Sequence, residues 1–468
     1  MPHTSPHALW FKTLFLFVTL LLVAGACKKD PIDNPDDNPN DTTQITPPDT
    51  LPFPPDTISV PLPECNTTYL PVIMAHGALA SGDTYAPQIM RFTSNGYCNN
   101  YLVAFDWNTL GGGASASVPK LDSVINAILA TTGAQQVELV GHSAGGGLGY
   151  NYLSDATRAA KVAHYVHIGS SPQSAPAGPG GSVPTLNIWS QGDAIVAGAD
   201  IPGATNVRLT TADHYEVATS PETFEAMYSF FRGTAPATTN IVPESRVNVS
   251  GRAVTLGENA PLNGATVKVY EVNTQTGFRT TEQPQFAFTT NAQGYWGPFT
   301  AKNGAYYEFF ILSAIPDDRP VHYYREPFKR TNTNVYLRTL PPPSSTAGLL
   351  LAGLPKNDNQ SVVAVFASSQ AVVNGRDVLT LAGTTLSTPQ LAPASKTAIA
   401  FFAYDANNNG TTDNTSIFLF SLTPFLAGID VFMSAAQPAT LTATLNGRNL
   451  NFRNWPSESE GVIVPVFD

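Results

Sequence analysis

The sequence predicts an α/β fold with a mostly parallel sheet, followed by an all-β C-terminal region of sandwich or barrel type. Two observations carry this prediction. Up to about residue 235, short apolar runs alternate with stretches of helical periodicity, which is typical of a parallel sheet covered by helices on both faces. Beyond Pro243, segments rich in β-branched and aromatic residues are separated by Gly, Asn and Pro turns, with little helical periodicity.

The first region, residues 62–240, is expected to form one domain of strands joined by helices. Each expected strand is a short apolar run, and each expected helix is a longer stretch whose apolar positions recur every three or four residues. The strands are expected over 70–75, 102–105, 137–140, 162–168, 185–189 and 207–209, and the helices over 86–95, 118–131, 146–153 and 221–231.

The second region is expected to be all-β, with strands separated by Gly, Asn and Pro turns. A proline run at 341–343 predicts its division into a β-sandwich-like domain, 245–340, and a second β unit, 345–468. The strands are expected over 248–254, 265–270, 306–312, 361–366, 378–381, 398–404, 416–422, 429–433, 439–445 and 462–467.

The N-terminus reads as a targeting segment. Lys12 precedes the apolar run 14–23, which is too short for a permanent membrane span and ends in small residues before Cys27. This ending resembles a bacterial lipobox, which implies removal of a signal peptide, 1–26, and acylation of Cys27. An ordinary secretory signal cut near Ala26 is the alternative. We therefore expect an exported bacterial lipoprotein at the outer membrane, the cell surface or the periplasmic face, held on the membrane by its acyl chains.

Residues 27–61 connect this anchor to the first domain. The segment is rich in Pro, Asp, Asn and Thr and has almost no large apolar side chains. Such a composition cannot bury a core, so a disordered tether is expected.

The remaining cysteines, Cys65 and Cys98, predict a disulfide. Each lies just before a predicted parallel strand, and neighbouring parallel strands begin on the same side of a sheet. An exported protein meets the oxidising conditions that such a bond needs. Two free thiols are the alternative.

The charge balance argues against nucleic acid as a partner. The formal net charge is −11, charged residues make up only 13% of the chain, and Lys and Arg do not cluster. No feature of the sequence indicates an oligomeric state.

The segment Gly141-His-Ser143-Ala-Gly145 follows a predicted strand and precedes a predicted helix. A Gly-x-Ser-x-Gly sequence in this context is the nucleophile elbow of a serine hydrolase. The glycines leave room for a tight strand-to-helix turn, which lifts the Ser143 hydroxyl above the sheet. The helix N-terminus then points at the reaction centre.

A serine nucleophile needs a general base, and His214 is the expected one. It follows the last predicted strand and leads into the final predicted helix, after Ser143 in the chain as this fold requires. The other histidines lie in the signal segment, beside tight turns, in a predicted buried strand or in the β region: His3, His7, His76, His142, His164, His167 and His322.

The acid that orients the base is expected to be Asp193. It follows a predicted strand, and the carboxyl ends of parallel strands share one edge of the sheet with Ser143. Asp200 and Asp213 remain alternatives, although Asp213 would have to turn back on its neighbour His214.

Two backbone N–H groups are expected to stabilise the oxyanion. Ala144 supplies one because it follows the nucleophile. Ala78 is expected to supply the other, since it follows the first strand and Gly77 lets the backbone turn inward.

Taken together, these motifs resemble the α/β-hydrolase lipases of bacteria, including the small lidless Bacillus lipases. The resemblance rests on 71–77, 141–145, 190–196 and 213–214. Further segments, 158–164, 219–224 and 237–243, resemble the Archaeoglobus-type carboxylesterase-lipases, which add a C-terminal β domain implicated in handling long acyl chains.

Two departures from the archaeal-type pattern stand out. Gly169 occupies the position where that relative carries its acid, so the carboxylate must come from elsewhere, and Asp193 fits the Bacillus-type placement. The glycine- and serine-rich link 109–117 replaces a lid insertion, which implies an open pocket.

The resemblance implies a lipase or carboxylesterase that cleaves an ester or acyl-lipid substrate through an acyl-enzyme, without a cofactor. A polyester depolymerase is one alternative. A non-catalytic binding or adhesion lipoprotein on a hydrolase scaffold is another.

Oxygen-bearing side chains alternate around a turn glycine in the β region, at Asp405, Asn407, Asn409 and Asp413. The pattern resembles a short Ca²⁺ loop. Only two of the four side chains are carboxylates and no bidentate Glu follows, so a polar hairpin turn is the interpretation that we favour.

Overall fold

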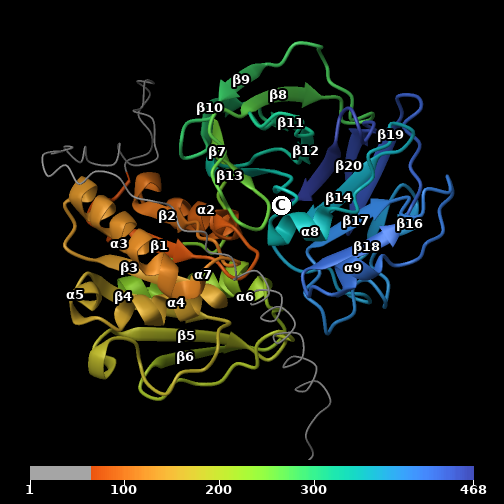
Figure 1. Cartoon of the computed structure of the whole chain (residues 1–468). Coiled ribbons are helices and arrows are strands. Elements are labelled where there is room, and N and C mark those ends of the chain that lie inside the picture. Colours follow the sequence, from red (N-terminus) through yellow and green to blue (C-terminus); the bar gives the residue numbers. More distant parts are fainter. Residues whose placement is uncertain (1–64) are drawn as a thin grey trace, which may run out of the picture. The chain divides into compact units, whose positions relative to one another are not determined.

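The computed structural model describes residues 65–468, which all belong to one compact unit (Figure 1). The predicted signal peptide 1–26, the lipidated Cys27 and the tether 27–61 lie outside the described residues. Over the described range, no helix is both long enough and apolar enough to cross a bilayer.

A six-stranded sheet forms the centre of the first domain, with the strand order β2-β1-β3-β4-β5-β6. Every neighbouring pair in it is parallel, as the sequence predicts. The strands are β1 (Val72–Ala75), β2 (Leu102–Phe105), β3 (Val137–His142), β4 (Val162–Ile168), β5 (Thr185–Ser190) and β6 (Thr205–Leu209).

Helices cover both faces of this sheet, because successive strand residues point to opposite faces. Val72 and Met74 pack with α2 and α7, whereas Ile73 and Ala75 pack with α3 and α4. The helices are α2 (Ala86–Ser94), α3 (Gly113–Thr132), α4 (Ala144–Leu153), α5 (Ala156–Ala159), α6 (Glu216–Thr219) and α7 (Pro221–Arg232), with 3₁₀ turns η1 (Gly82–Tyr85), η2 (Asn99–Tyr101) and η3 (Pro179–Gly181).

Helix α3 begins five residues before its predicted start. Gly112 precedes it with a φ of 72°, and the glycine- and serine-rich segment winds into the first helical turn. The link between β2 and α3 is therefore only residues 106–112.

The predicted disulfide between Cys65 and Cys98 is present. It ties the chain before β1 to the chain before η2 and β2.

The β region contains three sheets, with the orders β10-β7-β13, β18-β17-β14-β21-β12-β11-β8-β9 and β16-β15-β19-β20. The first strands are β7 (Val247–Thr255), β8 (Thr266–Val272), β9 (Phe286–Thr289), β10 (Tyr295–Ala301), β11 (Tyr306–Leu312), β12 (Val321–Arg325) and β13 (Asn332–Thr339). After helix α8 (Thr346–Leu351) come β14 (Val362–Ala367), β15 (Leu379–Leu381), β16 (Thr384–Thr385), β17 (Ala400–Tyr404), helix α9 (Phe418–Ser421), β18 (Leu426–Asp430), β19 (Thr440–Leu445), β20 (Arg448–Arg453) and β21 (Val462–Phe467).

The eight-stranded sheet lies between the other two, which makes this region a sandwich, as predicted. Phe402 on one face shares a core with Trp296 of the three-stranded sheet, and Phe401 on the other face shares a core with Leu445 of the four-stranded sheet. Strands from both sides of the proline run build the large sheet, because β21 pairs in parallel with both β12 and β14. The division of this region at the proline run stays a prediction.

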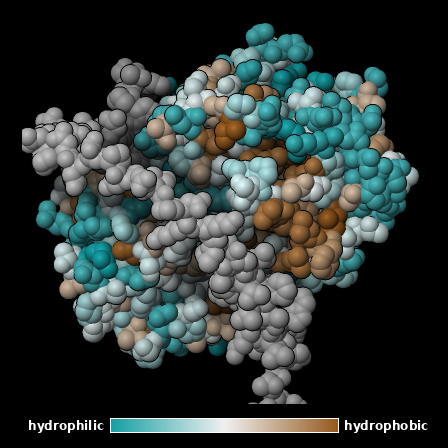
Figure 2. All heavy atoms as spheres, viewed as in Figure 1, coloured by the Kyte–Doolittle hydropathy of each residue, from teal (hydrophilic) through white to brown (hydrophobic). Residues whose placement is uncertain are grey.

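The predicted strand over 416–422 is wrong, because the helix α9 occupies this segment. The run is apolar without alternation, so it does not specify a strand. Its side chains Phe418, Leu419 and Leu422 are exposed, as is Leu349 of α8. Figure 2 shows an apolar area over these two helices.

Candidate active site

Ser143 occupies the turn between β3 and α4, and its backbone is strained. Its φ is 53° and its ψ is −119°, a combination that residues other than glycine rarely adopt. Close backbone contacts require glycine at both flanking positions. A Cβ on Gly141 would lie 2.3 Å from the carbonyl oxygen of Gly145, and a Cβ on Gly145 would lie 2.2 Å from that of Ala75. The spacing of the motif therefore follows from the tightness of this turn.

A continuous hydrogen-bond chain connects Ser143 to a base and an acid. The Oγ of Ser143 lies 2.9 Å from Nε2 of His214, and Nδ1 of His214 lies 2.7 Å from Oδ2 of Asp193. The side chains of His214 and Asp193 are only 2% and 1% exposed. A proton on Nδ1 leaves Nε2 free to accept from the serine hydroxyl, which is the tautomer that a general base requires.

The Asp193 carboxylate is held in place by its own loop. Its Oδ1 accepts hydrogen bonds from the backbone N–H groups of Ile195 and Val196, at 2.8 and 2.9 Å. Oδ2 is thereby left for His214. Because Asp193 follows β5 and His214 follows β6, both lie at the carboxyl edge of the sheet, where Ser143 follows β3.

The alternative acids are engaged elsewhere. Oδ1 of Asp213 accepts from the backbone N–H groups of Tyr215 and Glu216, both at 2.9 Å, and its Oδ2 accepts from Ala371. Asp200 accepts from the indole N–H of Trp189 at 2.9 Å. Of the three carboxylates that the sequence leaves open, Asp193 is the one hydrogen-bonded to His214.

Gly169 lies beside the same carboxylate. A Cβ on Gly169 would be 3.5 Å from Oδ2 of Asp193, and its φ is +47°. Position 169 and the Asp193 carboxylate therefore lie at one place in the fold.

Ser143 and His214 are contacted by three further residues, whose roles at the site the sequence analysis does not predict. Ser170, after β4, donates to the backbone carbonyl of Ser143 at 2.7 Å. Nε2 of His142 lies 2.8 Å from the backbone carbonyl of His214, and burial lowers the pKa of His142 well below its ordinary value. Phe425 of the β region places its ring 6.2 Å from the His214 ring.

The loop after β1 lies directly against the nucleophile. A Cβ on Gly77 would be 3.0 Å from that of Ser143. Residues 77–80 form a turn closed by the Ala80 N–H on the Gly77 carbonyl at 3.3 Å, and Leu79 has a φ of 59°. This segment, which contains Ala78, is called the oxyanion loop below. Ala144 is the first residue of α4, so its N–H lies at the helix N-terminus next to Ser143.

A buried polar cluster lies behind the oxyanion loop. Asp106, after β2, accepts from the Gly82 N–H at 2.8 Å and from Tyr336 Oη at 2.6 Å, and it pairs with Arg252. Burial alone would raise the pKa of Asp106, but Arg252 and the hydrogen bonds from Tyr336 and the Gly82 N–H hold it below its ordinary value. Burial lowers the pKa of His76 despite the nearby Asp106, so His76 is neutral.

The four residues whose pattern resembles a Ca²⁺ loop lie in one turn, and their polar groups are hydrogen-bonded within it. Oδ2 of Asp413 accepts from the side-chain amides of Asn407 and Asn409 at 2.6 and 3.0 Å, and Oδ2 of Asp405 accepts from the Gly410 N–H at 2.7 Å. Within residues 65–468, no group of three or more His, Cys, Asp or Glu side chains is placed to hold a metal ion. Ca²⁺ binding stays a prediction.

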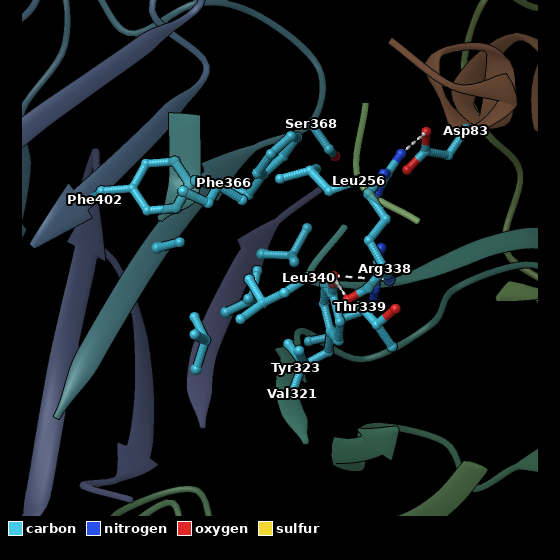
Figure 3. A pocket seen from close by; sticks show the side chains of 16 residues that line it. Asp83, Leu256, Val321, Tyr323, Arg338, Thr339, Leu340, Phe366, Ser368 and Phe402 are labelled. Atoms are coloured by element: carbon cyan, nitrogen blue, oxygen red, sulfur yellow. Dashed lines mark hydrogen bonds and ion pairs between the residues drawn. The ribbon is translucent and has the colours of Figure 1, made fainter. Parts of the chain in front are cut away.

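A cavity of about 50 Å³ lies inside the β region, away from Ser143 (Figure 3). Its walls are mostly apolar and include Leu256, Leu351 and Phe402, while Arg338 pairs with Asp83 at its edge. None of Ser143, Asp193 and His214 lines it.

The sheet, its helices and the Gly-x-Ser-x-Gly turn define an α/β hydrolase. Comparison with protein families agrees. A family model of the α/β hydrolase fold matches residues 71–180, one of the lipase C-terminal domain matches 245–342, and one of a further C-terminal domain matches 362–468. Domain by domain, the chain is therefore similar to the α/β-hydrolase lipases and esterases that carry a C-terminal domain.

Distant likenesses to solved structures cover the first domain. Aspergillus fumigatus lipase B is 16% identical, with a TM-score of 0.31 over 38% of this chain and 56% of that one. The mature Bacillus licheniformis lipase BlEst2 is 13% identical, with a TM-score of 0.29 over 37% and 96%. The Bacillus subtilis carboxylesterase CesB is 13% identical, with a TM-score of 0.28 over 36% and 86%. The chain thus spans little more than half of the Aspergillus lipase.

Proposed function

We propose that this protein is an exported, lipid-anchored serine hydrolase that cleaves carboxylic esters through an acyl-enzyme on Ser143. The hydrogen-bond chain from Ser143 through His214 to Asp193 carries this proposal. The predicted signal peptide and Cys27 supply the export and the anchor.

In this mechanism His214 takes the proton of Ser143 while the serine oxygen attacks the ester carbonyl. The imidazolium that forms faces the Asp193 carboxylate at 2.7 Å, which stabilises its charge. His214 then gives the proton to the leaving alcohol. Water, activated by the same histidine, hydrolyses the acyl-enzyme.

The developing oxyanion is stabilised by the N–H groups of Ala78 and Ala144. Ala144 adds the positive end of α4, and the oxyanion loop brings Ala78 against Ser143. In hydrolases of this type, losing one such donor costs about 3 kcal/mol of transition-state stabilisation.

An apolar acyl group suits the surroundings of His214. Phe425 faces its ring, and the exposed Leu422 lies three residues earlier in the chain. We therefore favour lipase or carboxylesterase substrates over strongly polar esters.

A panel of p-nitrophenyl esters from acetate to palmitate tests the proposal. The purified chain is expected to hydrolyse several members, and Ser143→Ala is expected to lower kcat by about 10⁶-fold, to background, without a change in the melting temperature. Ser154→Ala, at an exposed serine after α4, is the matched control and keeps full activity.

Other outcomes would contradict this function. A wild-type chain without turnover on any member favours a binding or adhesion protein on a hydrolase scaffold. Activity on a polyester film with none on the soluble panel favours a polyester depolymerase.

A further inference from the structure

A turn of the β region reaches behind the oxyanion loop. It joins β7 to β8 and is closed by hydrogen bonds between the backbones of Thr255 and Ala260, at 2.9 Å, and of Asn259 and Thr255, at 3.2 Å. Asn259 is only 3% exposed and has a φ of 56°. Asparagine tolerates this left-handed conformation better than most residues do, so the turn can present its side chain at a fixed place.

The Asn259 amide bonds the oxyanion loop directly. Its Nδ2 donates to the Ala80 carbonyl at 2.7 Å, and the hydroxyl of Ser81 donates to its Oδ1. Nδ2 also lies 3.3 Å from the Trp107 carbonyl and 3.3 Å from Nε2 of His76.

The charge state of His76 fits these contacts. Its Nδ1 lies 2.8 Å from the Gly77 carbonyl, which can only accept, so Nδ1 carries the proton. Nε2 is then an acceptor, and the Trp107 backbone N–H points at it from 3.3 Å, as does the Asn259 amide. Asn259 thus meets an acceptor at each contact of its NH₂ group.

The oxyanion loop needs such support because its conformation is unfavourable. Leu79 adopts a left-handed φ, and the turn residues 77–80 are linked to the first domain through the Leu79 N–H on Thr109 Oγ1, at 2.9 Å. Asn259 holds the other end of the turn at Ala80. Ala78 immediately precedes these two fixed points and belongs to the same turn, so the direction of its N–H depends on how they are held.

We propose that Asn259 is a positioning residue for the reaction at Ser143: the β region fixes the oxyanion loop through this side chain and so sets the direction of the Ala78 N–H. The inference rests on the proposed function and deepens it. It makes the β region a part of the catalytic apparatus as well as a neighbour of the substrate.

Substitution can distinguish the contacts of the Asn259 NH₂ group from those of its side-chain oxygen. Asn259→Gly keeps the left-handed backbone and removes every side-chain contact. Asn259→Asp keeps the acceptor for Ser81 but sets a carboxylate oxygen against the Ala80 and Trp107 carbonyls, which repel it. Both variants are expected to lower kcat on p-nitrophenyl acetate by about 10- to 100-fold, because small misplacements in an active site cost this much. KM is expected to stay within about threefold.

Fluorophosphonate labelling separates positioning from folding. The final labelled fraction counts folded sites and is expected to equal that of the wild type, whereas the labelling rate falls with kcat, because the phosphonyl oxygen uses the same oxyanion site. The matched control is Asn446→Gly. Asn446 also has a left-handed φ, of 50°, and bonds Val378 and Asp377 within the β region, so its replacement leaves kcat and the labelling rate unchanged.

Two results would overturn the role of Asn259. One is an Asn259→Gly enzyme with wild-type kcat and labelling rate. The other is a loss of kcat that disappears once it is divided by the labelled fraction. If Asn259→Gly does not fold, Ser81→Ala decides, since it removes one bond that orients the amide and is expected to lower kcat in the same direction. A wild-type chain that neither labels nor turns over esters would instead overturn the proposed function itself.

Discussion

His214 and His76 are both buried and both lie near a carboxylate, and they differ in what else surrounds them. His214 has its Nδ1 2.7 Å from Asp193 and its Nε2 2.9 Å from the serine hydroxyl. The Nε2 of His76 lies 3.9 Å from Asp106, a carboxylate that Arg252, Tyr336 and the Gly82 N–H already occupy. The same pair of residue types therefore supplies the proposed proton relay in one place and a structural cluster in the other. The two histidines differ in whether the second ring nitrogen faces a nucleophile, and this difference determines which of them can act as a base.

The two sites also differ in which parts of the chain build them. The proton relay comes entirely from the first domain. The cluster around His76 is completed by Arg252, Asn259 and Tyr336 of the β region. A substitution in the relay should remove chemistry and leave the fold intact, whereas one in the cluster should act on stability or on the oxyanion loop.

Asp193→Asn sharpens this comparison with the largest expected effect. An amide cannot hold the Nδ1 proton of His214 in the required tautomer, so kcat is expected to fall by about 10⁴-fold with the melting temperature unchanged. Ester turnover at saturating substrate measures it, with Asp200→Asn as the control that keeps activity. Near-wild-type turnover in Asp193→Asn would remove Asp193 from the relay.

Arg252→Met tests the buried polar cluster behind the oxyanion loop. Removing one partner of a buried ion pair leaves Asp106 without its main compensation, and a loss of about 3–5 kcal/mol in the free energy of unfolding is expected at pH 8. Turnover per folded molecule should change far less than in Asp193→Asn. Urea unfolding measures the loss, and Lys302→Met, which breaks an exposed pair with Glu271, is the control with a nearly unchanged melting temperature.

The pH dependence of that loss gives its cause. In the wild type the folded pKa of Asp106 is below the ordinary value, so its contribution is present above about pH 4 and is lost as the pH falls below it. In Arg252→Met the main group that opposes the effect of burial is gone, so the folded pKa of Asp106 is expected to rise above its ordinary value, and the variant loses stability as the pH rises through that pKa. The difference between the two proteins should therefore be smaller at pH 5 than at pH 8. A difference independent of pH would assign the loss to packing.

The sequence predicts the first domain far better than the second. Its strands are mostly buried on both faces and its helices are amphipathic, so each element can be recognised from the local sequence pattern. Asp193 could be preferred because the carboxyl ends of parallel strands share one edge with the elbow. In the β region, β12 is not predicted because it carries the polar residues His322 and Arg325. These side chains can be buried because they pair with Glu308 and Asp468, which are distant in the sequence.

The residues of the cluster around His76 could not be predicted, because they are far apart in the chain. Asn259 lies 183 positions from His76 and 179 from Ala80 in the chain, and the turn that carries it looks like any polar turn. Contacts at such separations depend on how the domains pack, which a local pattern does not encode. Phe425 beside His214 was missed on the same grounds.

Mapping the site of fluorophosphonate attachment tests the central claim most directly. Intact-mass spectrometry of the wild type should show one adduct per chain, fragmentation should place it on Ser143, and Ser143→Ala should remain unlabelled. An adduct on another residue, or labelling that persists in Ser143→Ala, would contradict the assignment of Ser143 as the nucleophile.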